Sequence, residues 1–119
     1  MTAHSNGQLK QEIIKIYNTI NQEMYVVGVS QQRAEILGDK ILILARHRRI
    51  PVLALLDKLA PETAQLADLV LVRENKRRLA AAVESLLGLK VLAILKDYDP
   101  ESDLAATVVV CASPISSGF

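Results

Sequence analysis

Apolar residues near the start of the chain recur every three or four positions, with polar residues between them. Between residues 8 and 24 this spacing is typical of an amphipathic helix. Gly28 ends the helix, and a strand is expected over 29–37. A Gly38-Asp39 turn then leads into a strongly apolar strand over 40–45. The two strands are expected to form a hairpin.

Two prolines punctuate the middle of the chain and predict two helices. Pro51 suits the first turn of a short helix, because proline has no N–H to lose at that position. Pro61 and Glu62 suit the first turn of a long helix that ends at Gly88. The inner stripe of this long helix is expected to consist of Leu66, Leu69, Val70, Leu79, Val83, Leu86 and Leu87.

Two further apolar segments, 89–95 and 104–111, predict a second hairpin joined by a polar loop over 96–103. The resulting order predicts an α+β fold, a two-layer sandwich. A mostly antiparallel sheet of about four strands, in two hairpins, packs against one long helix and one or two shorter helices. The 119 residues fit a single domain over 1–119, with an ordered core over about 8–111 and short loose tails at both ends.

The strands carry apolar residues on both faces, which is the main functional signal. Side chains alternate along a strand, and the few predicted helices cover only one face of the sheet. The second face is therefore expected to bind a partner or a second copy of the chain. We place the interface on Ile41, Ile43, Val108 and Val110 or on their alternate neighbours, because a slip of one residue reverses the faces. The full predicted set of partner-binding residues is Ile41, Leu42, Ile43, Arg46, Arg48, Arg49, Val108 and Val110.

Composition narrows the class of protein without identifying it. The hydrophobic fraction of 50% excludes wholesale disorder, and 14 basic residues nearly cancel 13 acidic ones. The N-terminus has no apolar run of the signal-peptide kind, and no run approaches the roughly 20 residues that cross a bilayer. The single cysteine, Cys111, has no internal disulfide partner. We therefore expect a cytoplasmic protein without a membrane partner.

Candidate catalytic and metal-binding groups are sparse in the sequence. His47 lies among arginines with no second metal ligand at a suitable spacing, and no His or Lys near Cys111 in sequence lowers its pKa. Cys111 is expected to be a buried, inert residue. The acidic run from Asp97 to Asp103 lacks the glycine and glutamate of a calcium loop, and the five glycines are scattered. We expect no enzyme activity, cofactor or metal.

The residues at the two ends of the predicted long helix resemble a known family pattern. Leu59-Ala60-Pro61-Glu62 opens the helix and Gly88-Leu89-Lys90-Val91 closes it into a strand. This pattern resembles a family of small bacterial single-domain proteins long classed as of unknown function, although Ala60 replaces a usual hydroxyl and the final turn lacks a usual glycine. The family pattern also contains an arginine in the long helix, to which Arg73 or Arg77 corresponds. It contains an aspartate near the final turn, to which Asp97 corresponds.

The chain also resembles cyanobacterial proteins of this kind that serve as carboxysome assembly factors. That resemblance implies a chaperone-like role and an association with the carboxysome. The protein would bind an extended C-terminal segment of a shell protein.

Two functions from different classes remain open at this point. The first is a non-enzymatic protein-binding or assembly factor, expected to be a homodimer, whose apolar sheet face or groove accepts an extended segment of a partner. The alternative is a small nucleic-acid-associated regulator that uses its arginines and lysines on phosphates. Three tyrosines and one phenylalanine offer few stacking platforms, so we favour the protein partner. The basic clusters are Arg46, Arg48 and Arg49, and Arg73, Lys76, Arg77 and Arg78.

Overall fold

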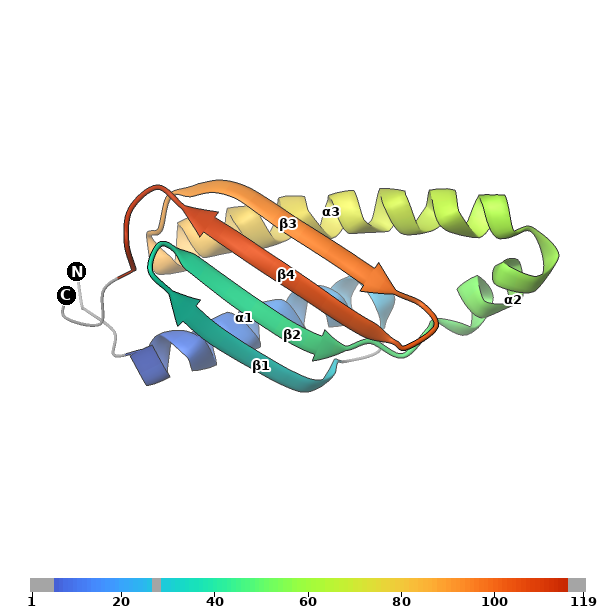
Figure 1. Cartoon of the computed structure of the whole chain (residues 1–119), viewed down its shortest axis with the longest axis horizontal. Helices are drawn as coiled ribbons and strands as arrows, with labels where there is room; N and C mark the ends of the chain where they lie inside the picture. The colour runs from blue at the N-terminus through green and yellow to red at the C-terminus, as the bar shows by residue number, and fades with distance from the viewer. Residues whose placement is uncertain (1–5, 27–28, 116–119) are drawn as a thin grey trace.

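The computed structural model describes residues 6–26 and 29–115 and shows a four-stranded antiparallel sheet with three helices. The sheet order is β1-β2-β4-β3, and each sequential hairpin contributes two neighbouring strands. Figure 1 shows α1 and α3 behind one face of the sheet and α2 beyond its end. The predicted α+β architecture is confirmed. The elements are α1 (Asn6–Tyr25), β1 (Ser30–Leu37), β2 (Lys40–Arg46), α2 (Pro51–Leu59), α3 (Pro61–Leu87), β3 (Val91–Asp99) and β4 (Leu104–Cys111).

The helix boundaries follow from backbone chemistry at proline and glycine. Both α2 and α3 begin with proline, whose missing N–H would have no intrahelical partner at that position. At the end of α3, Gly88 adopts a left-handed conformation with φ of 68° and donates its N–H to Glu84 O. Within the described residues, none of the helices combines the length and apolarity needed to cross a bilayer.

The core lies between the sheet and the helices α1 and α3. The pairing of Ile41 with Val109 and of Ile43 with Thr107 directs these four side chains to the helix-covered face, where all are fully buried. From the helices, Ile13 and Tyr17 of α1 and Leu79 and Val83 of α3 complete this layer. Two helices therefore cover one face of the sheet, and none of the described helices covers the opposite face (Figure 1).

The predicted inner stripe of α3 is correct only in the C-terminal half of the helix. Leu79 and Val83 are fully buried, and Leu87 is partly buried against the core. The 27-residue helix is about 40 Å long, so its N-terminal half extends past the sheet, where α2 lies beside it (Figure 1). The prediction is wrong for four exposed side chains, which are Leu66, Leu69, Val70 and Leu86.

The strand β3 is longer than the sequence pattern suggested. It continues through Asp99, and the predicted polar loop shrinks to residues 100–103. Its polar side chains alternate: Asp97 is exposed, whereas Lys96 and Tyr98 are partly buried on the helix-covered side. The loop prediction is wrong for 96–99 because it treated polarity as a sign of a turn. An alternation with period two is equally consistent with a strand.

The predicted loose C-terminal tail is wrong for its first residues. Ala112 donates its N–H to Lys90 O at 2.9 Å, and Ile115 donates its N–H to Gly38 O at 2.8 Å. The Ile115 side chain is buried in the core. At the other end, α1 begins at Asn6, within the predicted N-terminal tail. The remaining tail predictions concern residues 1–5 and 116–119, which lie outside the described residues.

Cys111 is buried at the end of β4, as predicted for a small apolar residue. Burial and then the charge of Asp39 raise the pKa of its thiol, which opposes formation of the reactive thiolate. Cys111→Ser is expected to lower the free energy of unfolding by about 1–3 kcal/mol, because it buries a hydroxyl in an apolar site. Urea denaturation measures this loss, with Cys111→Ala as the variant that adds no polar group. Unchanged stability of Cys111→Ser would contradict the expectation.

Candidate binding sites

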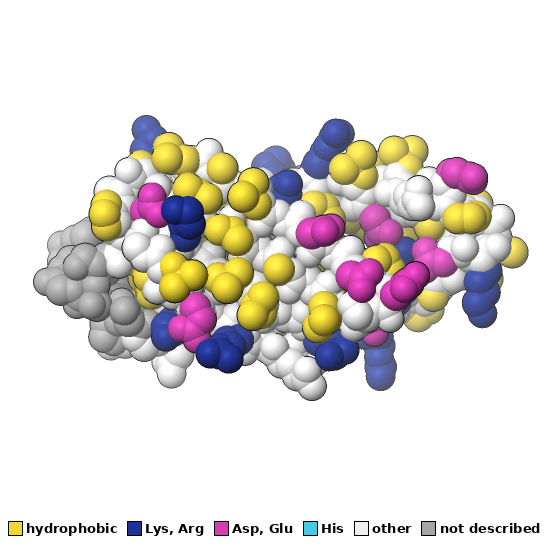
Figure 2. Space-filling view, in the orientation of Figure 1, with side chains coloured by type: hydrophobic (Ala, Val, Ile, Leu, Met, Phe, Trp, Pro, Cys, Tyr) yellow, Lys and Arg dark blue, Asp and Glu magenta, His cyan; other side chains and the backbone are white. Residues whose placement is uncertain are grey.

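The face of the sheet turned away from the helices exposes apolar side chains. Leu42 pairs with Val108, and Val108 pairs with Leu95, so the three residues form a row across β2, β4 and β3. Leu95 is 59% exposed, and no described part of the chain covers the row. Figure 2 shows yellow hydrophobic side chains gathered over these strands. We call this surface the outer face; it comprises Leu42, Leu44, Ala93, Leu95, Leu104, Ala106, Val108 and Val110.

Charged side chains border the outer face unevenly. Asp97 and Asp99 lie on β3, at the sheet edge, near the turn into β4. On the β2 side, Lys40 is paired with Asp39 at 2.7 Å. Arg46 donates hydrogen bonds to the Gln31 side chain and the Ser102 carbonyl. The β3 border is therefore acidic.

The structure divides the predicted apolar set between two faces. Leu42, Val108 and Val110 belong to the outer face, whereas Ile41 and Ile43 are fully buried against the helices. The prediction that grouped the two isoleucines with Val108 and Val110 on one interface is wrong. Their strands pair so that each isoleucine lies opposite Val109 or Thr107. The partner-binding role of Ile41 and Ile43 is corrected accordingly.

The predicted arginine triad also separates in space. Arg46 lies at the border of the outer face, and Arg48 is exposed at a pocket on the opposite side of the sheet. Arg49 is only 11% exposed and forms two bidentate ion pairs, with Asp57 of α2 and Asp68 of α3. Bonds to Asp57 and then to Asp68 raise the pKa of Arg49. This residue ties the exit of β2 to both helices and has little capacity left for a partner.

The second basic cluster is also partly neutralised within the chain. Arg77 and Arg78 both bond Glu74 at 2.7 Å, and these bonds, led by Arg77, lower the pKa of Glu74 to about 2. The arrangement is ordinary for one face of a helix, where residues three and four apart are neighbours. It leaves less positive charge for phosphates than the sequence indicated.

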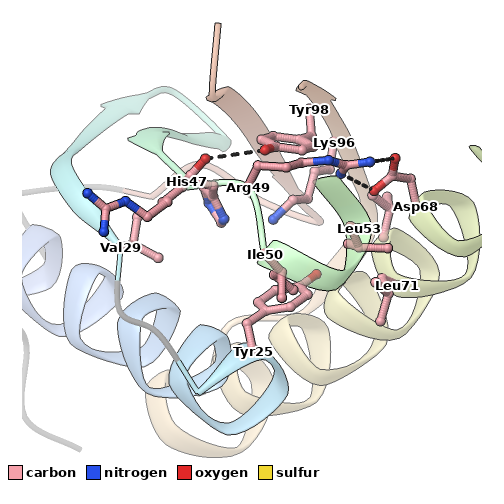
Figure 3. A pocket seen from close by; sticks show the side chains of 12 residues that line it. Tyr25, Val29, His47, Arg49, Ile50, Leu53, Asp68, Leu71, Lys96 and Tyr98 are labelled. Atoms are coloured by element: carbon pink, nitrogen blue, oxygen red, sulfur yellow. Dashed lines mark hydrogen bonds and ion pairs between the residues drawn. The ribbon is translucent and has the colours of Figure 1, made fainter. Parts of the chain in front are cut away.

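A pocket lies where the exit of β2 meets the ends of α1, α2 and β3. The space between its side chains, counted together with the open solvent at its mouth, is about 540 Å³. Figure 3 shows Lys96 reaching from β3 toward the middle of this space, close to His47. The wall is mixed: aliphatic side chains come mainly from the helices, whereas Arg48 and Arg49 follow β2, Lys96 lies on β3 and Asp68 lies on α3. The lining residues are Tyr25, Val29, His47, Arg48, Arg49, Ile50, Leu53, Asp68, Leu71, Val72, Lys96 and Tyr98.

A buried polar network holds Lys96 at the pocket. Its Nζ donates to the Tyr17 hydroxyl at 2.9 Å and to Asn75 Oδ1 at 2.8 Å. The Tyr17 hydroxyl in turn lies 2.7 Å from His47 Nε2. Because this hydroxyl accepts from Lys96, it is free to donate to His47 Nε2, which leaves the ring proton on Nδ1. The network thus joins α1, α3, β3 and the exit of β2.

Burial shifts the pKa values of this network toward the neutral forms. Burial, followed by repulsion from Lys76, lowers the pKa of Lys96 to about 7. Burial and then the charge of Lys96 lower the pKa of His47 to about 4, while burial raises the pKa of Tyr17 to about 12. Among the described residues, none of the ion pairs joins Lys96 to a carboxylate. The ammonium form of Lys96 therefore has no carboxylate paired with it in the described part of the chain.

The sequence pattern alone does not reveal this network. The predicted loop includes Lys96, the predicted chemistry of His47 is limited to metal binding, and the pattern assigns no role to Asn75. The available signal was the period-two alternation through Lys96, Asp97 and Tyr98, which directs Lys96 inward. In the described part of the chain, His, Cys, Asp and Glu side chains form no cluster of three or more suited to a metal ion.

Together, the fold and these sites define a two-layer α+β protein with an exposed apolar sheet face and a separate polar pocket. Comparison with models of protein families, with curated proteins and with solved structures found no match. The resemblance carried by the helix junctions therefore stays a prediction.

Proposed function

We propose that the protein is a non-enzymatic protein-binding module for assembly, and that its outer face and the free edge of β3 hold an extended segment of a partner. The single observation that carries this proposal is the row of Leu42, Val108 and Leu95. Three large apolar side chains in register across three strands form a surface that water solvates poorly. Burying this row under a partner gives a favourable free energy without a chemical step.

An extended segment suits this surface because β3 is an edge strand. In the described sheet β3 pairs only with β4, so its other edge offers N–H and C=O groups for pairing, apart from the N–H groups of Val91 and Tyr98, which donate to the side chains of Glu84 and Asp97. A segment added there as a further strand gains backbone hydrogen bonds. Alternate side chains of that segment then lie beside Ala93 and Leu95 and extend the apolar row.

The charge of the border supports a partner segment that carries basic residues. Asp97 and Asp99 lie on the outer side of β3, so a matching segment carries alternating apolar residues and a Lys or Arg near this end. The resemblance described above suggests a concrete source, the extended C-terminal segment of a carboxysome shell protein. We adopt that segment as the partner to be tested.

Leu95→Asp is expected to weaken peptide binding at least tenfold, because it places a charge in the apolar row. The measurement is fluorescence anisotropy with labelled peptides from the C-terminal segments of shell proteins of the same host. Leu66→Asp is the matched control: Leu66 is 61% exposed, close to the 59% of Leu95, but lies on α3 away from the sheet. The control is expected to bind like the wild type, and circular dichroism checks that both variants fold.

Three results would overturn this proposal. The first is that no shell-protein peptide binds more tightly than about 1 mM. The second is that light scattering shows a dimer which Leu95→Asp dissociates, because the outer face would then hold a second copy. The third is tight, salt-sensitive binding of a random oligonucleotide that is lost when Arg46, Arg48 and Arg49 are replaced by Ser, as the nucleic-acid alternative requires.

A further inference from the structure

The amino group of Lys96 has hydrogen-bonding capacity beyond its bonds within the chain. A lysine ammonium offers three N–H donors, and the Tyr17 hydroxyl and Asn75 Oδ1 account for two of them. The close view in Figure 3 shows the side chain reaching into the pocket rather than lying against its wall. A ligand in the pocket can therefore accept the third hydrogen bond.

The charged residues of the pocket favour an anion in that position. Arg48, Arg49 and Lys96 are its cationic lining residues, and Asp68 is the only carboxylate among the twelve residues of the lining. Arg49 pairs with both oxygens of Asp68, at 2.7 and 2.9 Å, and also with Asp57, so its charge is used within the chain. An anion would be attracted mainly by Lys96 and Arg48. A buried ammonium without a counter-ion is costly, and an anion that pairs with it recovers much of that cost.

The remaining lining side chains favour a ligand that has an apolar part. Ile50 and Leu53 lie where α2 begins, and Leu71 and Val72 come from α3. The space of about 540 Å³ counts open solvent at the mouth together with the interior, so the pocket is a partly open site suited to a small ligand. The combination of one deep cation and aliphatic walls distinguishes an organic anion from a bare inorganic one.

We propose that this pocket binds a small organic carboxylate with an apolar chain or ring, whose carboxylate accepts a hydrogen bond from Lys96 Nζ. The apolar part lies against Ile50 and Leu53 from the start of α2 and against Leu71 and Val72 from α3. This site uses the helix-covered side of the sheet and so extends beyond the protein-binding function of the outer face. The two can be tested separately.

The experiment compares hexanoate with hexanamide, a neutral ligand of almost the same shape, by isothermal titration calorimetry. The wild type is expected to bind hexanoate at least tenfold more tightly than hexanamide, because only the anion pairs with the ammonium. Lys96→Met keeps the length of the side chain and removes the charge, and it is expected to lose at least tenfold in hexanoate affinity. Lys90→Met, at an exposed position outside the pocket, is expected to bind like the wild type.

A second titration, with inorganic phosphate, tests whether the apolar side chains of the pocket contribute to the affinity or whether any anion binds equally well. Inorganic phosphate is expected to bind more weakly than hexanoate, because it cannot use the aliphatic walls. Equal affinities for hexanoate and hexanamide would overturn the proposal, as would an unchanged affinity in a folded Lys96→Met variant. Failure of hexanoate to bind more tightly than about 10 mM would also overturn it. Phosphate binding as tight as that of hexanoate would refute the role of the apolar walls.

Discussion

Ile43→Asp is expected to abolish folding, whereas Leu42→Asp, one position earlier, is expected to leave the fold in place. Ile43 is 0% exposed and lies between the sheet and the helices. Loss of its burial costs about 1.5–3 kcal/mol, and an unpaired carboxylate there costs several kcal/mol more. That total approaches the whole stability of an ordinary domain, about 5–15 kcal/mol. Leu42 faces the other way, where a carboxylate keeps access to water.

Circular dichroism and urea denaturation distinguish the two variants directly. Ile43→Val serves as the control at the buried site, since removal of one methylene group costs only about 0.5–1.5 kcal/mol. Leu42→Asp is expected to retain a cooperative unfolding transition and to lose binding at the outer face. If Leu42→Asp unfolded as completely as Ile43→Asp, the assignment of the two faces would be wrong.

Lys96→Met is expected to remove a large dependence of stability on pH. In the folded protein the pKa of Lys96 is lowered to about 7, against an ordinary value of 10.5. Between these values the unfolded chain holds the proton and the folded chain does not, so the free energy of unfolding rises with pH. The slope approaches about 1.4 kcal/mol per pH unit inside the window and vanishes below it. Below pH 7 the wild type therefore carries the full cost of the buried charge.

Urea denaturation at intervals from pH 6 to pH 10 tests this expectation. The difference in stability between the wild type and Lys96→Met is expected to change steadily above pH 7, in favour of the wild type. The exposed Lys90 provides the matched control, because Lys90→Met is expected to follow the wild type across the range. Parallel stability curves for the wild type and Lys96→Met would show that the amino group keeps an ordinary pKa in the folded state.

The two proposed sites use opposite sides of the same strand. On β3, Leu95 belongs to the outer face, and its neighbour Lys96 lies at the pocket. A ligand that changes the position of the Lys96 side chain would affect strand β3. The free edge of this strand is where we propose that the partner segment binds. Coupling between the two sites would appear as a change in the affinity for the peptide when the pocket is occupied. Hexanoate added to the peptide titration provides that measurement.

Local sequence signals determined the helices and hairpins of this protein. The spacing of apolar residues, two prolines at helix starts and Gly88 at a helix end act over a few residues, so the chain specifies them without tertiary contacts. The same signals predicted the α+β class and two hairpins, both of which the structure shows. They also identified Cys111 as a buried residue.

Only the tertiary structure decided which side of each strand is buried and what the polar residues do. Strand register separates Ile43 from Val108, because a shift of one position exchanges the faces and the turn residues do not specify it closely enough. Leu66 is exposed because the N-terminal half of α3 extends beyond the end of the sheet. The Lys96 network joins residues as many as 79 positions apart, a separation at which local patterns carry no information.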